Sequence, residues 1–288
     1  MKKLLILSGK GGTGKTTTAA AFTRFAKARA IADCDVDAPN LHIVTSMQTQ
    51  PQRSAFLGGD KAAIDPDLCI GCGLCSQHCR LGAIRTLDGR CEVDEVACEG
   101  CGVCEYVCPQ KAVSLHQDEA GEVSLWQEDT TFVTATLKMG RGNSGKLVTE
   151  VKNTLNKHAD AELAIIDGSP GIGCPVIASV SGVDLVLIVA EPSMSGISDM
   201  ERIVKTASGL RAHVAVCVNK WDASPESAQA IEAYCAEQKL PFVGRIPYDK
   251  KASQAINGGK SVADFDCPAR DALYSVYQKT MQVLEELP

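Results

Sequence analysis

The sequence predicts an α/β protein: a doubly wound, mostly parallel sheet that is interrupted by a small, cysteine-rich domain of the α+β class. Three observations support this fold class. The apolar run Leu4–Leu7 leads into a glycine-rich loop, and an alanine-rich helical pattern follows at 16–28. Apolar runs of strand length alternate with helical patterns from residue 163 onward, as in parallel sheets. A segment between these two parts holds two short cysteine repeats.

Size and composition are those of an ordinary globular protein. The chain of 288 residues is 45 % hydrophobic and 22 % charged, which suits one large domain or two modest ones. Its net charge of −6 gives no basic surface for nucleic acid. No apolar run reaches the roughly 18 residues of a membrane helix, and the C-terminal helical pattern lacks a basic face for membrane binding. We therefore expect a cytoplasmic protein without nucleic-acid or membrane partners.

The loop after the first strand fits the phosphate-binding pattern G-x4-G-K-[ST], with Gly9 and Gly14 as its fixed glycines. In such a loop, backbone N–H groups and a helix N-terminus surround phosphate oxygens, and glycines let the backbone approach the anion. We expect Lys15 to neutralise the β- and γ-phosphates and the Thr16 hydroxyl to bind Mg²⁺. The residues predicted to bind the nucleotide here are Gly11, Gly12, Thr13, Gly14, Lys15, Thr16 and Thr17.

Acidic residues follow two further predicted strands. The short buried strand at 30–32 is followed by Asp33, Asp35 and Asp37. The apolar run at 163–166 ends in Asp167 and a glycine-rich tail, which is the form of a Walker B motif followed by a switch II loop. Because ligands of a doubly wound sheet lie at the carboxyl ends of its strands, these acids can reach the γ-phosphate, its Mg²⁺ or the attacking water. We predict that Asp167 holds Mg²⁺ through a water.

A second lysine in the loop, Lys10, is not required by a general phosphate-binding loop. The string KGGTGKTT that contains it resembles the deviant Walker A motif of the MinD/Mrp ATPases, a family that also includes ParA and the nitrogenase iron protein. The resemblance implies ATP hydrolysis by a nucleotide-sandwich dimer, either a homodimer or a heterodimer with a related ATPase. In that dimer, Lys10 reaches the nucleotide of the partner.

The same resemblance assigns roles to residues outside the loop. It implies that Asp35 is the switch I aspartate that positions the attacking water, and that Asn219 and Pro247 lie beside the adenine. The catalytic residues expected are accordingly Lys10, Lys15, Asp35 and Asp167.

Eight cysteines form two copies of the spacing C-x2-C-x2-C-x3-C. This spacing is typical of bacterial-type ferredoxins with two [4Fe–4S] clusters, in which the fourth cysteine of each run ligates the other cluster. The first cluster is thus predicted on Cys69, Cys72, Cys75 and Cys108, and the second on Cys98, Cys101, Cys104 and Cys79. Zinc is the alternative metal, although structural zinc sites usually show pairs of C-x2-C. The first run departs from the pattern because Arg80 replaces the usual proline after its last cysteine.

The cysteine module interrupts the nucleotide-binding domain. We expect residues 60–117 to form an inserted two-cluster ferredoxin domain, and residues 1–59 and 118–288 to form the ATPase domain. Residues 48–61 are predicted to be a linker into the module, and residues 117–121 a turn-rich exit from it.

Three hypotheses about function follow. In the first, a dimeric ATPase couples nucleotide-driven rearrangement to electron transfer or to handling of a metal cofactor, with a redox or metal-cofactor protein as its partner. In the second, the protein is an iron–sulfur carrier like Mrp, and its clusters are cargo. In the third, it is a positioning ATPase that uses the ferredoxin only for docking. Complete ligation of two clusters inside one module favours the first hypothesis.

Cys174 lies outside both runs, just after the predicted switch II loop. In the nitrogenase iron protein, cysteines near that region carry a cluster between two subunits. The match is offset by a few positions and supplies no second cysteine, so a structural or free thiol is the simpler interpretation.

Overall fold

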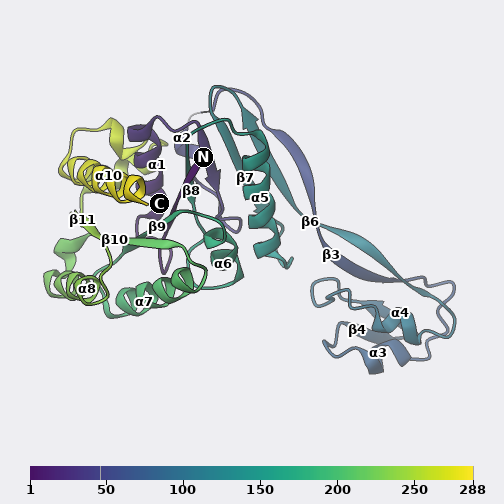
Figure 1. Cartoon of the computed structure of the whole chain (residues 1–288). Coiled ribbons are helices and arrows are strands. Elements are labelled where there is room, and N and C mark those ends of the chain that lie inside the picture. Colours follow the sequence, from purple (N-terminus) through teal and green to yellow (C-terminus); the bar gives the residue numbers. More distant parts are fainter. Residues whose placement is uncertain (46, 288) are drawn as a thin grey trace. The chain divides into compact units, whose positions relative to one another are not determined.

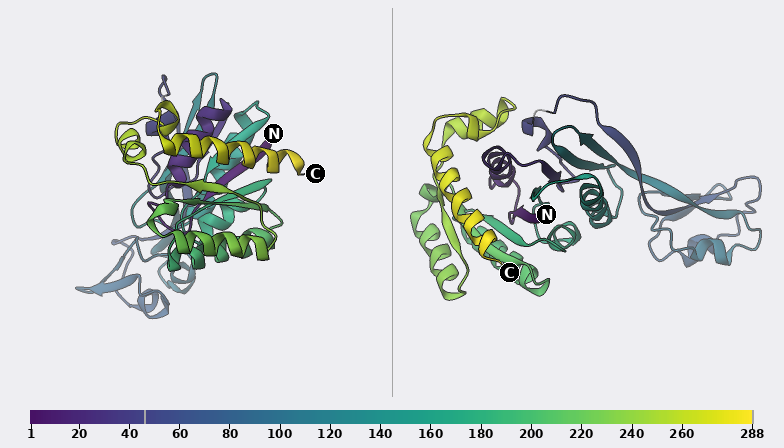
Figure 2. Two further views of the ribbon diagram at one scale, coloured as in Figure 1. Left: turned by 90° about the vertical axis from the view of Figure 1, so that its left-hand side faces the viewer. Right: turned by 45° about the horizontal axis from the view of Figure 1, so that its top comes forward.

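The computed structural model describes residues 1–45 and 47–287 and divides the chain into two compact units. The first unit comprises Met1–Ser54, Val123–Thr136 and Ser144–Pro288. The second unit comprises Ala55–Glu122 and Leu137–Asn143. Figures 1 and 2 show both units, coloured along the sequence.

The described strands include a nine-stranded sheet with the order β11-β10-β9-β1-β8-β2-β7-β6-β3. Its inner pairs, from β10–β11 through β9, β1 and β8 to β2–β7, are parallel. The α/β class with a large, mostly parallel sheet is therefore confirmed. The strands are β1 (Lys2–Leu7), β2 (Ala30–Asp33), β3 (Gln52–Ile64), β6 (Val113–Gln127), β7 (Thr131–Leu137), β8 (Leu163–Asp167), β9 (Leu185–Ala190), β10 (His213–Asn219) and β11 (Phe242–Ile246).

The centre of the sheet is built from strands without polar faces. All six residues of β9 are buried, and β8 is buried from Ala164 to Asp167. Continuous apolar runs suit parallel strands because helices cover both faces of such a sheet. The register pairs Ile6 of β1 with Asp167 of β8, so the loops that follow these two strands lie side by side.

Two groups of helices flank the sheet of the first unit (Figure 1). One group contains α1, which packs on α10 with the Phe22 and Tyr277 rings edge to face at 5.2 Å. The other contains α5, which packs on α6. No helix in the described ranges is both long and apolar enough to cross a membrane. The helices are α1 (Lys15–Ala26), α2 (His42–Thr45), α5 (Ser144–His158), α6 (Cys174–Val180), α7 (Met194–Gly209), α8 (Pro225–Glu237), α9 (Lys250–Asn257), α10 (Pro268–Glu286), and the 3-10 turns η1 (Trp221–Ala223) and η2 (Val262–Asp264).

The second unit contains two near-copies of one small motif. Each copy has a five-residue helix, α3 (Leu74–His78) or α4 (Val103–Val107). The strands β4 (Ile84–Leu87) and β5 (Arg90–Val93) form an antiparallel hairpin between them. The small core of this unit is made of cysteine, alanine, isoleucine and valine side chains.

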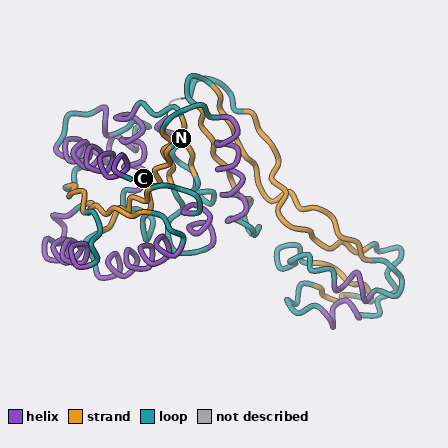
Figure 3. Tube along the Cα trace, in the orientation of Figure 1, coloured by secondary structure: helices purple, strands orange, loops and turns teal. Residues whose placement is uncertain are grey.

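Two of the expected loops are strands, and those expectations were wrong. Most of the predicted linker at 48–61 belongs to β3, and the predicted exit at 117–121 lies inside β6 (Figure 3). The two strands are neighbours in the sheet. They pack so closely that a Cβ added to Gly58 would lie 2.6 Å from the methyl group of Ala120. Ladder hydrogen bonds and close cross-strand packing outweigh the weak strand propensity of these Gly-, Asp- and Gln-containing stretches.

Candidate functional site

The glycine-rich loop between β1 and α1 is braced by the carboxyl end of β10. Asn219 Nδ2 donates to the carbonyl oxygen of Thr13 at 2.7 Å, and Lys220 Nζ donates to that of Gly12 at 2.9 Å. Gly14 has a left-handed φ of 100°, and a Cβ there would lie 2.2 Å from Asn219 Nδ2. Only glycine satisfies both conditions, so the fixed glycine of the motif is required by backbone conformation and by close packing.

Four predicted residues meet at the start of α1. Lys15 Nζ lies 2.7 Å from Asp167 Oδ1 and 3.6 Å from Asp35 Oδ2. The Thr16 hydroxyl donates to Asp167 Oδ2 at 2.6 Å. Burial lowers the pKa of Lys15, but the charge of Asp167 and its hydrogen bond outweigh this effect, so the pKa is raised overall. The lysine is thus fully protonated, and an oxygen pair suited to Mg²⁺ lies beside it.

The three acids after β2 differ in their surroundings. Asp33 is fully buried and accepts hydrogen bonds from the backbone N–H groups of Asp35, Asn40 and Leu41, which fixes the loop that follows. Burial, assisted by the charge of Asp167, raises the pKa of Asp33 to about 7. Asp35 is partly buried near Lys15, whereas Asp37 is exposed. The structure therefore gives Asp33 a positioning role in this loop and leaves Asp35 as the acid close to Lys15.

The loop after β8 is tied to its neighbours by backbone hydrogen bonds. The N–H of Gly168 donates to Ile6 at 2.9 Å, and the N–H of Gly171 donates to Ser8 at 3.1 Å. The Ser169 hydroxyl donates to the carbonyl oxygen of Cys34. The loops after β1, β2 and β8 are therefore linked to one another, and a displacement of one of them alters the contacts of the other two.

Lys10 has a partner that the sequence interpretation missed. Its Nζ lies 2.6 Å from Oε2 of Glu191, the residue that follows β9. The same Nζ donates to the Ser195 hydroxyl at 3.4 Å. Because β9 pairs with β1, its carboxyl end lies at the same edge of the sheet as the glycine loop. Asp167 was predicted because it is an acid directly after an apolar strand. Glu191 also follows an apolar run, so the same criterion applied to β9 would have found it.

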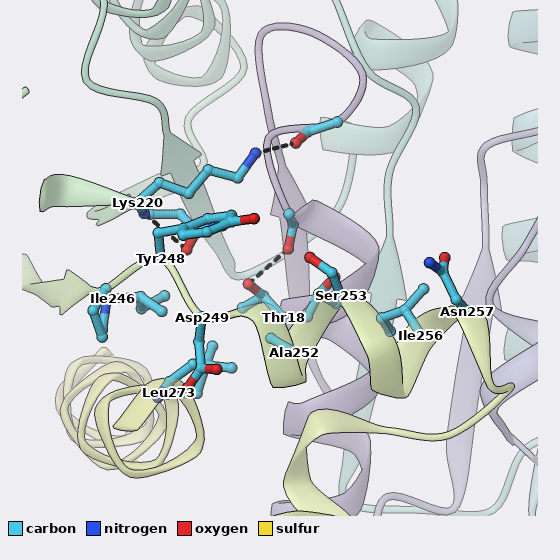
Figure 4. Close-up of a pocket in the computed structure, with 16 residues that line it drawn as sticks. Thr18, Lys220, Ile246, Tyr248, Asp249, Ala252, Ser253, Ile256, Asn257 and Leu273 are labelled. Carbon is cyan, nitrogen blue, oxygen red and sulfur yellow. Dashed lines mark hydrogen bonds between the residues drawn. The ribbon is translucent and has the colours of Figure 1, made fainter. Parts of the chain in front are cut away.

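A pocket lies beside the loop, and Figure 4 shows its lining. Asn219 and Pro247, the two residues expected near adenine, both line it together with Gly12 and Gly14. Helix α9, which the sequence analysis did not predict, contributes Ala252, Ser253, Ile256 and Asn257, and α10 contributes Leu273. Apolar walls with a few amide and hydroxyl groups, next to a phosphate-binding loop, suit a nucleoside.

The second unit gathers cysteines from both runs. Cys69, Cys72 and Cys75 line one cavity together with Cys108 from the second run. Backbone N–H groups donate to sulfur at Cys79 (from Ala83, 3.3 Å), at Cys108 (from Ala112, 3.2 Å) and at Cys98 (from Ala62, 3.5 Å). Bonds of this kind stabilise thiolates that bind iron–sulfur clusters.

The four thiols around this cavity can be compared with the ligand sets of a cluster and of a single metal ion. Among residues 1–45 and 47–287, no group of three or more His, Cys, Asp or Glu side chains is arranged to hold one ion. A [4Fe–4S] cluster binds each thiolate at a different iron, so its ligands stand farther apart around a cavity. Four thiols lining one cavity meet that requirement.

Comparison with known proteins agrees with the geometry of the first unit. The model of the CobQ/CobB/MinD/ParA nucleotide binding domain matches residues 4–262. The chain belongs to this family. The MinD ATPase of Pyrococcus furiosus superposes on this member with a TM-score of 0.59 at 14 % identity, covering 98 % of this chain and 99 % of that one. The ATP complex of a Cyanothece McdA variant gives a TM-score of 0.60 at 18 % identity, covering 98 % and 96 %.

Relatives of this family member by sequence include proteins of archaea. An uncharacterized protein of Methanocaldococcus jannaschii is 34 % identical over 98 % of this chain and 97 % of its own length. A protein of Pyrococcus horikoshii named iron-sulfur cluster carrier protein is 25 % identical over 99 % of this chain and 87 % of its own length.

Proposed function

We propose that this CobQ/CobB/MinD/ParA-family protein is an iron–sulfur ATPase that couples Mg-ATP hydrolysis in a nucleotide-sandwich dimer to electron transfer or to handling of a metal cofactor. In this proposal residues 60–117 are the ferredoxin domain with two [4Fe–4S] clusters, and 1–59 with 118–288 are the ATPase domain. The observation that carries it is the cavity at which Cys69, Cys72 and Cys75 meet Cys108, because crossed ligation requires this combination of runs.

The chain's own residues supply the nucleotide chemistry. Lys15 neutralises the β- and γ-phosphates, Thr16 and Asp167 hold Mg²⁺, and Asp35 positions the attacking water. Lys10 exchanges its ion pair with Glu191 for the phosphates of the partner's nucleotide, which makes dimerisation dependent on ATP. The pocket around Asn219 and Pro247 takes the adenine.

The module supplies the clusters with thiolates and with backbone N–H donors. The second set is Cys98, Cys101, Cys104 and Cys79, with the N–H of Ala62 donating to Cys98 Sγ and that of Ala83 to Cys79 Sγ. Bound [4Fe–4S] clusters supply one-electron transfer. A redox or metal-cofactor protein is therefore the partner that we expect.

A carrier function is the second candidate, and the relatives named iron-sulfur cluster carrier protein favour it. The two candidates differ in what happens to the iron. Protein purified without oxygen should contain about eight iron atoms per chain, four for each cluster. Electron transfer predicts that this iron stays bound through repeated reduction and oxidation, whereas a carrier passes it intact to an apo-acceptor. Stoichiometric zinc in place of iron would overturn both.

A further inference from the structure

The cavity of the first cysteine run is lined by five cysteines, not four. Besides Cys69, Cys72, Cys75 and Cys108, its lining includes Cys91. Cys91 belongs to neither repeat, and the ligand assignments above leave it without a role. A [4Fe–4S] cluster offers four iron positions to protein ligands, so the cavity holds one thiol more than the cluster requires.

Cys91 is built into the wall of this cavity by the β4–β5 hairpin. The residue is only 6 % exposed and pairs with Thr86 in the antiparallel register, with Thr86 Oγ1 3.6 Å from Cys91 Sγ. Its backbone N–H donates to the sulfur of Cys69, which lowers the pKa of that thiol, and its own thiol interacts with the thiols of Cys69 and Cys75. Two predicted ligands of the first cluster are thus its immediate neighbours.

The internal repeat provides a comparison within the molecule. At the offset that relates Cys69 to Cys98, Cys91 corresponds to Ala62, and Thr86 corresponds to Leu115. The backbone is equivalent at the two places, because the N–H of Ala62 donates to Cys98 Sγ at 3.5 Å just as that of Cys91 donates to Cys69. The close approaches are equivalent too, since a Cβ on Gly71 would meet Gly89 O at 1.9 Å and one on Gly100 would meet Asp60 O at 2.0 Å.

The backbone around the two sulfur atoms, Cys69 Sγ and Cys98 Sγ, is therefore equivalent. The two halves of the repeat, named here by the run whose sulfur is contacted, differ in the side chain beside that sulfur: Cys91 in the first half and Ala62 in the second. An alanine suffices for packing in the second half, where Ala62 is buried. The first half instead has a thiol at the matching position, next to a hydroxyl where the other half has a leucine. Packing against the hairpin thus does not account for the thiol.

We propose that Cys91 is a reserve ligand of the first cluster, able to take the iron position of Cys69 or of Cys75. This inference rests on the proposed two-cluster module. With the cluster bound, Cys91 would take the iron position of Cys69 as a thiolate, and its proton would go to the released Cys69 thiolate or, where Cys69 is absent, to solvent. No electron is gained or lost, so no oxidant or reductant takes part. The first cluster thereby survives the loss of a ligand that the second cluster does not survive.

The test compares matched variants, each purified without oxygen and assayed for iron and by electron paramagnetic resonance after reduction. Wild type and Cys91→Ala should both contain about eight iron atoms per chain. Cys69→Ala should also retain about eight, with a changed spectrum for one cluster, because Cys91 replaces the missing ligand. Its counterpart Cys98→Ala should fall to about four. Cys69→Ala/Cys91→Ala should likewise fall to about four.

A gain of function completes the test. Placing the thiol in the other half, as Ala62→Cys in the Cys98→Ala background, should restore about eight iron atoms. Equal loss in Cys69→Ala and Cys98→Ala would overturn the reserve role, and so would loss of a cluster in Cys91→Ala alone, which would make Cys91 a resident ligand. A wild-type protein without two clusters would instead overturn the proposed function, so the two failures are distinguishable.

Discussion

Lys15 Nζ lies 2.7 Å from Asp167 Oδ1, in an ion pair whose side chains are only 6 % and 0 % exposed. Lys15, the proposed phosphate-binding lysine, and Asp167, the proposed Walker B aspartate, therefore stabilise each other. Removing one partner of a buried ion pair leaves the other charge uncompensated. Experiments on either residue have to separate this structural role from nucleotide binding.

Lys15→Ala should abolish tight ATP binding, because the main neutralising charge of the loop is lost. It should also lower the free energy of unfolding by about 3 to 5 kcal/mol, since Asp167 stays buried without its partner. The double variant Lys15→Ala/Asp167→Asn should recover stability but not binding. Calorimetric titration with ATP and urea unfolding of the three proteins check both points. If stability is unchanged in Lys15→Ala, the ion pair has no structural role.

Asp35→Ala should bind Mg-ATP and hydrolyse it slowly, because the positioned water is lost and phosphate binding is not. We expect kcat to fall by about two to three orders of magnitude, as for loss of a water-positioning group. Asp37→Ala is the matched control, since Asp37 is exposed in the same loop. Steady-state phosphate release measures both variants. Normal turnover by Asp35→Ala would remove Asp35 from the catalytic residues.

Glu191→Gln should strengthen ATP-dependent dimerisation, because Lys10 loses the ion pair that holds it within its own chain. Lys10→Ala should weaken dimerisation, since in the proposed dimer Lys10 supplies the charge for the partner's nucleotide. Sedimentation velocity with a non-hydrolysable ATP analogue reports the dimer fraction. If the two variants change dimerisation in the same direction, Lys10 does not exchange its ion pair with Glu191 for the nucleotide of the partner, and the hypothesis is wrong.

Lys152 links α5 to the carboxyl end of α6 and gives a prediction on pH. Its Nζ donates to the carbonyl oxygens of Ala178 at 2.8 Å, of Ser179 at 2.7 Å and of Ser181. Lys152→Met should cost about 1 to 3 kcal/mol of unfolding free energy, because those carbonyls lose their donor.

Burial lowers the pKa of Lys152 from its usual 10.5 to about 8. Between these two values the unfolded chain binds more protons, so the lysine's contribution to stability increases as pH rises from about 8 toward 10.5. Urea unfolding at pH 7.5 and at pH 9.5 should therefore show a smaller cost of Lys152→Met at the lower pH. An equal cost at both pH values would mean that Lys152 is charged over the whole range.

Nucleotide state and cluster potential should be linked, because the chain enters the second unit after the loop of Asp35 and returns to the first before Asp167. By reciprocity, if ATP shifts the potential, reduction shifts ATP affinity by the same free energy, typically about 1 to 3 kcal/mol. Redox titrations with and without a non-hydrolysable analogue, on wild type and on Lys10→Ala, measure the linkage. Identical potentials in all four samples would contradict it.

Several features are determined by the sequence alone. The glycine loop, the acids after apolar runs and the alternation of strands and helices from residue 163 onward are local signals, and the family and the mostly parallel sheet follow from them. The two cysteine runs are also local, since ligand spacing is a property of a short stretch of chain.

Other features depend on contacts between residues that are distant in sequence, and these were decided only by the tertiary structure. Residues 52–64 and 113–127 are strands because they pair with each other, although their composition suggests a linker and turns. Glu191 is the partner of Lys10 because β9 lies next to β1. Cys91 joins the first cysteine run because a hairpin folds it against Cys69 and Cys75. In each case the deciding free energy comes from packing and hydrogen bonds between segments, which no local pattern contains.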